Sequence, residues 1–156
     1  MKPTKQVGTI PVRRTSDGSL EIMLVTSRRT GRWIIPKGWP SKRLKDADAA
    51  AREAAEEAGV IGQISKKPIG SFGYSKSASG GSRLFSVDVY LLHVEAELQL
   101  WPEQRERSRS WFGPHLAATK VHEPELANLI QTIVHTQLVP ATGSTIFPSS
   151  ILHTAK

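Results

Sequence analysis

The segment Asp46–Ala58 is the clearest helix in the sequence, and its composition restricts how it can pack. Gly59 follows it and provides the left-handed position that often ends a helix, while Asp46 or Asp48 can cap its start. Alanines at helical spacing form one face, namely Ala47, Ala51, Ala54 and Ala58. Because these side chains are small, we expect this face to lie closely against a β-sheet.

A second face of the same helix carries three carboxylates that weaken it locally. Glu53 lies three and four residues before Glu56 and Glu57, so all three share one face. Like charges at this spacing cost about 0.2–0.5 kcal/mol, and acids near a helix C-terminus oppose its dipole. Arg52 offsets part of this through Glu56. A bound divalent cation would remove the conflict, and carboxylate oxygens suit Mg²⁺, with Mn²⁺ as a substitute.

The net charge of +7 is distributed very unevenly along the chain. Residues 1–45 contain eleven Lys or Arg and two acids, for +9, whereas residues 46–60 contain five acids and one Arg, for −4. An acidic helix face is usually just solvated, but this one lies within a strongly basic chain. Because Mg²⁺ typically binds through a few carboxylates and the phosphates of a substrate, the arrangement indicates an anionic, phosphorylated small molecule as the partner.

Alternating apolar residues and turn signals predict an α/β sandwich around this helix. The expected strands cover residues 6–14, 20–27, 33–35, 61–66, 83–97 and 110–112. Asp17-Gly18 separates the first two strands, which are therefore expected to form a hairpin. A small helix is expected to begin at Pro114, and an amphipathic helix covers residues 123–138. Residues 1–139 are thus expected to form a single domain.

Two segments are expected to lack regular structure. Residues 75–82 are rich in Ser and Gly and are expected to form a mobile loop, either a lid over bound phosphates or a connection without a role. Residues 140–156 are expected to form a weakly structured tail. Three tryptophans are expected to pack in the core rather than stack on a base: Trp39, Trp101 and Trp111.

Composition excludes several kinds of site. The chain has no Cys, so disulfides, thiolate metal sites and Cys nucleophiles are excluded. No apolar run approaches the ~18 residues of a membrane span, and no signal-peptide core is present, so we expect a cytoplasmic protein without membrane contact. Nucleic acid is a less favoured partner, because no RNA-binding motif occurs and few aromatic residues lie among the basic ones.

The region from Gly38 to Val60 resembles the Nudix box, G-x5-E-x7-R-E-U-x-E-E-x-G-U, in which U is a bulky aliphatic residue. Seven of its nine fixed positions match in register: Gly38, Arg52, Glu53, Glu56, Glu57, Gly59 and Val60. Leu44 stands where the pattern has its first Glu, and Ala54 where it has an aliphatic residue. In the family that Glu supports the loop before the helix and pairs with the Arg, so Arg52 needs another partner, for which Asp48 is a candidate.

The resemblance covers roughly residues 5–138 and implies a Nudix-type α/β/α sandwich with a mixed β-sheet. It also implies a metal-dependent pyrophosphohydrolase, in which a metal-activated water cleaves a phosphoanhydride bond. By this resemblance Glu53, Glu56 and Glu57 bind the metal and one of them acts as base, Arg52 orients them, and the Gly38 carbonyl adds a ligand.

Within the family the chain looks most similar to diphosphoinositol polyphosphate and diadenosine polyphosphate hydrolases. This likeness rests on the segments at residues 25–28, 32–36 and 107–112. Six residues are the substrate-binding candidates by position: Ser27, Arg28, Arg32, Lys37, Arg83 and Arg107. Glu103 and Glu106 are expected to pair with neighbouring Arg side chains rather than to bind metal.

Two other functions are compatible with the same residues. Leu44 and its basic loop favour a non-catalytic module that binds a nucleotide or polyphosphate without cleaving it. The bases in residues 1–45 favour an enzyme that removes pyrophosphate from RNA 5′ ends. We rank the hydrolase of a small polyphosphorylated molecule ahead of both.

Overall fold

The computed structural model describes residues 2–136, and the tail expected at residues 140–156 lies outside them. The strands are β1 (Thr4–Arg14), β2 (Leu20–Thr26), β3 (Trp33–Ile34), β4 (Lys37–Gly38), β5 (Val60–Ile64), β6 (Gly70–Ala78), β7 (Gly81–Glu97) and β8 (Arg109–Phe112). The helices are α1 (Asp46–Ala58), α2 (Pro114–Lys120) and α3 (Pro124–Thr136). None of these helices is long and apolar enough to cross a membrane.

All eight strands belong to one mixed sheet. Its main path runs β3-β2-β1-β7-β5, while β4 pairs with β1, β6 with β7 and β8 with β2. β1 and β7 run parallel, and the other paired strands run antiparallel. The expected hairpin of β1 and β2 is confirmed, with Val12 opposite Ile22. The expected mixed sheet is therefore present.

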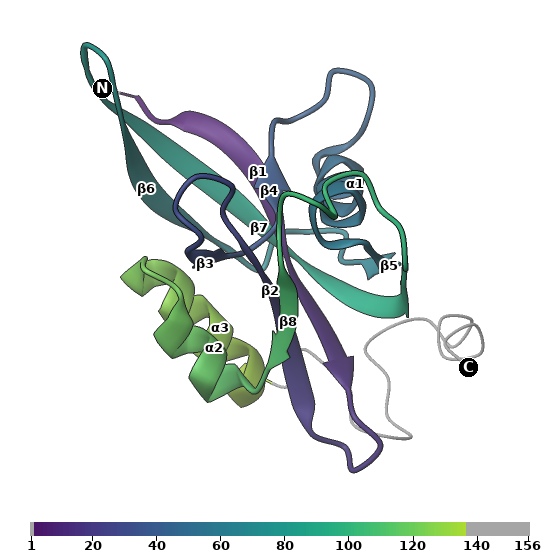
Figure 1. The fold of residues 1–156 in the computed structure, drawn as a ribbon. Helices are drawn as coiled ribbons and strands as arrows, with labels where there is room; N and C mark the ends of the chain where they lie inside the picture. Colours follow the sequence, from purple (N-terminus) through teal and green to yellow (C-terminus); the bar gives the residue numbers. More distant parts are fainter. Residues whose placement is uncertain (1, 137–156) are drawn as a thin grey trace.

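Helices cover both faces of this sheet, with α1 on one side and α2 and α3 on the other (Figure 1). The alternation of side chains along β2 explains how one strand serves both layers. Ile22 and Leu24 pack in the cluster that includes α2 and α3, whereas Met23 and Val25 pack against α1. The α/β/α sandwich expected from the sequence is confirmed.

Helix α1 packs as expected at its C-terminal half but is capped differently. Ala54 and Ala58 are fully buried, as are Ala49 and Ala50, which take the places expected for Ala47 and Ala51. The N-cap is Lys45, without a side-chain hydrogen bond, so the expected cap by Asp46 or Asp48 is wrong. Asp46 instead accepts a hydrogen bond from Lys5 Nζ at 2.5 Å, which ties the helix start to β1.

The mobile loop expected at residues 75–82 is wrong, because this segment forms the tip of a long hairpin (Figure 1). Strands β6 and β7 pair from Gly70 opposite Val89 to Ala78 opposite Gly81. Gly80 and Gly81 have φ values of 92° and 129°, which permit the tight turn. Cross-strand pairing with β7 therefore outweighs the weak intrinsic strand preference of Ser and Gly.

Candidate active site

Helix α1 brings two of the predicted metal ligands, Glu53 and Glu57, against β4. Lys37 N–H donates a 3.3 Å hydrogen bond to Glu57 Oε1. A Cβ atom at Gly38 would lie 2.3 Å from the carboxyl carbon of Glu53, so only glycine leaves room for this carboxylate. A side chain at position 38 would therefore displace the Glu53 carboxylate from its present place.

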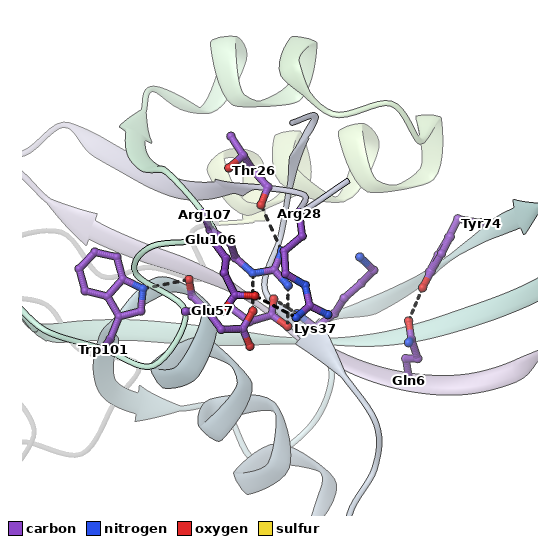
Figure 2. A network of polar contacts seen from close by, with 10 residues as sticks. Gln6, Thr26, Arg28, Lys37, Glu57, Tyr74, Trp101, Glu106 and Arg107 are labelled. Atoms are coloured by element: carbon purple, nitrogen blue, oxygen red, sulfur yellow. Dashed lines mark hydrogen bonds and ion pairs between the residues drawn. The ribbon is translucent and has the colours of Figure 1, made fainter. Parts of the chain in front are cut away.

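Glu57 is the most buried of the three carboxylates, and Lys37 and Arg107 lie beside it (Figure 2). Arg107 Nη2 lies 3.6 Å from Glu57 Oε2, and these two side chains are only 7% and 8% exposed. Arg107 also donates to Glu103 Oε1 at 2.7 Å and to the Thr26 carbonyl at 3.1 Å. Arg107 is therefore fixed between α1 and β2, and the expected pairing of Glu103 with an Arg is confirmed.

Burial raises the pKa of Glu57 to about 7, although Arg107 opposes this change. Burial also raises the pKa of Glu53, and the charge of Glu56 adds to this effect. Burial lowers the pKa of Lys37, against the attraction of Glu57. The surroundings of Glu53 and Glu57 therefore disfavour the charged form of their carboxylates. A bound cation would favour the charged form and lower both pKa values.

These carboxylates fit a hard divalent cation by their chemistry. Glu53, Glu56 and Glu57 supply only oxygen ligands, and two of them have raised pKa values because of burial and mutual repulsion. Within residues 2–136 no three acidic or histidine side chains are gathered closely enough to hold a metal ion by themselves.

Arg52 Nε lies 3.9 Å from Glu56 Oε2, so Arg52 pairs with Glu56 rather than with Asp48.

The C-terminal turn of α1 is held by the segment between β7 and β8. Trp101 Nε1 donates to the Glu57 carbonyl at 3.2 Å (Figure 2), and Glu103 N–H donates to the Glu56 carbonyl at 3.0 Å. Arg109 Nη1 donates to the carbonyls of Ala58 and Gly59 at 3.0 and 3.2 Å. Helix α1 has no basic residue in its last turn. Arg109 therefore supplies the positive charge that its C-terminus favours.

Sequence reasoning missed the roles of Trp101 and Arg109, because both lie more than 40 residues from the helix they support. The guanidinium of Arg109 also lies 3.8 Å from the centre of a Trp101 ring. A Cβ atom at Gly59 would lie 2.6 Å from Arg109 Nη1 and from Trp101 Cδ2. Gly59 is therefore needed both for its φ of 65° and for this close contact.

The loop that departs from the Nudix pattern is closed by its own hydrogen bonds. Ser41 Oγ accepts from the backbone N–H groups of Arg43 at 3.0 Å and Leu44 at 3.2 Å. The Leu44 side chain, which stands in place of the family's Glu, lies partly exposed. A serine turn thus gives the loop a local support that does not need a carboxylate at position 44.

A cavity of about 440 Å³ is bordered by Lys37 and Arg107, the two residues that contact Glu57. Five of the six predicted substrate-binding residues line it: Ser27, Arg28, Arg32, Lys37 and Arg107. Ser27 Oγ contacts Thr30 Oγ1 at 2.6 Å and accepts from Arg32 N–H at 3.1 Å, so it also shapes the β2–β3 turn. Arg83 does not line this cavity but a neighbouring one.

The same cavity contains residues that the sequence did not indicate. Arg29 and Lys76 bring the cations to six, against the single acid Glu123. Arg29 follows the predicted Arg28, and Lys76 was missed because its segment was expected to be a mobile loop rather than β6. Glu106 pairs with Arg28 at 3.3 Å, which is 78 residues away and is not one of the neighbouring Arg side chains expected for that acid. A polyanion is the kind of ligand that such a cavity attracts.

Comparison with known proteins places these features in a family. The family model for the NUDIX domain matches residues 2–133. The chain is 32% identical to Nudix hydrolase 18, mitochondrial, of Arabidopsis thaliana, over 68% of this chain and 62% of that protein. It is 31% identical to diphosphoinositol polyphosphate phosphohydrolase 3-beta of Bos taurus, over 83% of this chain and 77% of that protein.

The fold agrees with solved structures of the same kind. A binary complex of the Ap4A hydrolase of C. elegans superposes with a TM-score of 0.64 and 21% identity, over 86% of this chain and 97% of that chain. The chain spans about 54–62% of the length of the first plant relatives that it matches. With the family model covering nearly all described residues, the chain belongs to the Nudix family.

Proposed function

We propose that this chain is a divalent-metal-dependent pyrophosphohydrolase that cleaves a phosphoanhydride bond in a polyphosphorylated small molecule. The observation that supports this most directly is that the carboxylates of α1 and the cationic cavity share residues at their border. Lys37 and Arg107 contact Glu57 and also line the cationic cavity. A phosphate chain bound in that cavity would therefore lie beside the carboxylates of α1.

Each part of the site has a role in this reaction. Glu53, Glu56 and Glu57 would hold Mg²⁺, or Mn²⁺ in its place, together with phosphate oxygens of the substrate, and one of them would take the proton that the attacking water releases. When bound, the metal supplies a Lewis acid and an activated water. The cations of the cavity bind the phosphate oxygens and orient the chain, and Arg107 offsets negative charge beside Glu57.

The relatives named for diphosphoinositol polyphosphates and for Ap4A support this class of substrate. The test is a panel of dinucleoside polyphosphates, nucleotide sugars, nucleoside triphosphates and diphosphoinositol phosphates, each with Mg²⁺ and with Mn²⁺. Glu56→Gln and Glu57→Gln are expected to remove turnover while far-UV circular dichroism stays unchanged. Glu97→Gln, which removes an exposed acid paired with Arg13, is the control and should keep wild-type rates. Full activity in both site variants would refute the proposal.

A binding module that does not cleave its ligand is the second candidate, because Leu44 replaces an acid of the family's pattern. Calorimetry that detects tight binding of a panel member, combined with no release of phosphate or nucleotide under either metal, would favour this candidate. Rapid metal-dependent release would exclude it.

A further inference from the structure

A second cavity, of about 630 Å³, adjoins the cationic one. Arg29, Lys76 and Ser77 line both cavities. A ligand whose phosphates lie in the first cavity can therefore extend past these residues into the second. Arg29 and Lys76 keep the passage between the two cavities cationic.

A row of aromatic rings connects the two cavities. Tyr74 lines the first, while Phe85 and Trp39 line the second. The rings of Tyr74 and Phe85 are stacked, with centres 4.9 Å apart and planes 14° apart. The Trp39 ring follows at 6.0 Å from Phe85. Tyr74 is held in place because its hydroxyl donates to the buried Gln6 Oε1 at 2.6 Å (Figure 2).

Trp39 is the exposed end of this row. It is 53% exposed, so the expectation that it packs in the core is wrong, whereas Trp101 and Trp111 are partly buried. The Arg83 guanidinium lies 5.8 Å from the Trp39 ring centre and 5.3 Å from that of Phe85. Packing in the core therefore does not explain a tryptophan at this position. An exposed aromatic ring that lines a cavity is typical of a binding surface.

We propose that the second cavity is a nucleobase subsite, in which a base stacks on Trp39 beside Arg83 while the phosphates run past Arg29 and Lys76 into the first cavity. A base offers a planar π-face to both an indole and a guanidinium. A cyclitol ring has no such face and gains nothing comparable from Trp39. The subsite therefore favours a nucleotide-containing polyphosphate over a diphosphoinositol phosphate. This inference rests on the proposed function for the placement of the phosphates.

The test compares two ligands that share a triphosphate chain but differ in whether they carry a nucleoside, namely ATP and inorganic tripolyphosphate. Affinities are measured by calorimetry with the full chain in the Glu56→Gln background, so that turnover does not interfere. Stacking on an aromatic side chain predicts that Trp39→Ala weakens ATP binding about 5- to 100-fold. Tripolyphosphate binding should change less than about twofold. Trp39→Phe should retain most of the ATP affinity.

Leu116→Ala removes another exposed apolar side chain, on α2 and outside both cavities, and should leave both affinities unchanged. An equal loss for both ligands in Trp39→Ala would assign Trp39 to loop structure and overturn the subsite. So would an unchanged ATP affinity in Trp39→Ala. Because the readout is binding, a chain that binds the base through Trp39 but hydrolyses nothing would refute only the proposed function.

Discussion

Glu57 is a single buried carboxylate that costs the metal-free fold stability at neutral and alkaline pH. Its side chain is 8% exposed, and burial raises its pKa to about 7 from an ordinary value of 4.5. The folded state therefore binds the proton of the Glu57 carboxyl more tightly than the unfolded state does. For such a group the folded protein loses stability as pH rises from about 4.5 through about 7.

Glu57→Gln should consequently stabilise the metal-free protein at alkaline pH. The pKa difference of about 2.5 units corresponds to about 3 kcal/mol at pH 8, the upper limit of the gain. At pH 4.5 and below, both proteins carry an uncharged group at position 57, so the difference should nearly vanish. Urea unfolding in EDTA at several pH values measures it. A variant that is less stable than wild type at pH 8 would show that the Arg107 pairing outweighs desolvation.

Helix α1 depends on a segment distant in the sequence, residues 101–109, for the hydrogen bonds at its C-terminus. Arg109 Nη2 donates to the Leu98 carbonyl at 2.9 Å, in addition to its two bonds at the helix end. Arg109→Ala should therefore destabilise the protein by roughly 2–4 kcal/mol, because several partly buried carbonyls lose a charged donor. It should also lower turnover, since Glu56 and Glu57 lie in the turn that is released.

Arg13→Ala is the matched control for Arg109→Ala. Arg13 also lies over a tryptophan, 4.1 Å from a Trp111 ring centre, but its ion pairs with Glu21 and Glu97 are at the surface. Exposed pairs of this kind contribute about 0–1 kcal/mol. Chemical denaturation and steady-state rates compare the two variants. Equal losses of stability would mean that the bonds of Arg109 to α1 add nothing beyond stacking.

The elements differ in how well the sequence predicted them, for physical reasons. Asp46–Ala58 was correctly delimited because alanine content and Gly59 are local signals. Residues 75–82, at the tip of the β6–β7 hairpin, were expected to form a loop because their strand structure comes from pairing across the turn, as between Ser77 and Ser82. That error hid Lys76 from the list of candidate residues. The core packing expected for Trp39 was wrong for a related reason, because exposure depends on tertiary contacts.

The whole molecule places the acidic face of α1 beside a cationic cavity. The uneven charge distribution predicted acids surrounded by bases, but not that β2–β3, β4, β6 and the segment before β8 would meet around one cavity. Long-range placement of this kind leaves no local pattern. The predicted residues Arg28 and Arg107 therefore share the cavity with Arg29 and Lys76, while Arg83 contributes to its neighbour.

The six cations of the first cavity should make polyphosphate binding strongly dependent on salt, because mobile ions screen exposed charges beyond about 8–10 Å. We expect the affinity for tripolyphosphate to fall roughly tenfold or more as ionic strength rises to physiological values. Arg29→Gln combined with Lys76→Gln should weaken binding at low salt and reduce the slope of the logarithm of affinity against the logarithm of salt concentration. Lys66→Gln combined with Lys67→Gln removes the same charge from an exposed turn outside both cavities and should keep the wild-type slope. Calorimetry across a salt series distinguishes the two pairs. Identical slopes in both double variants would mean that the net charge of +7, and not the cavity, attracts the ligand.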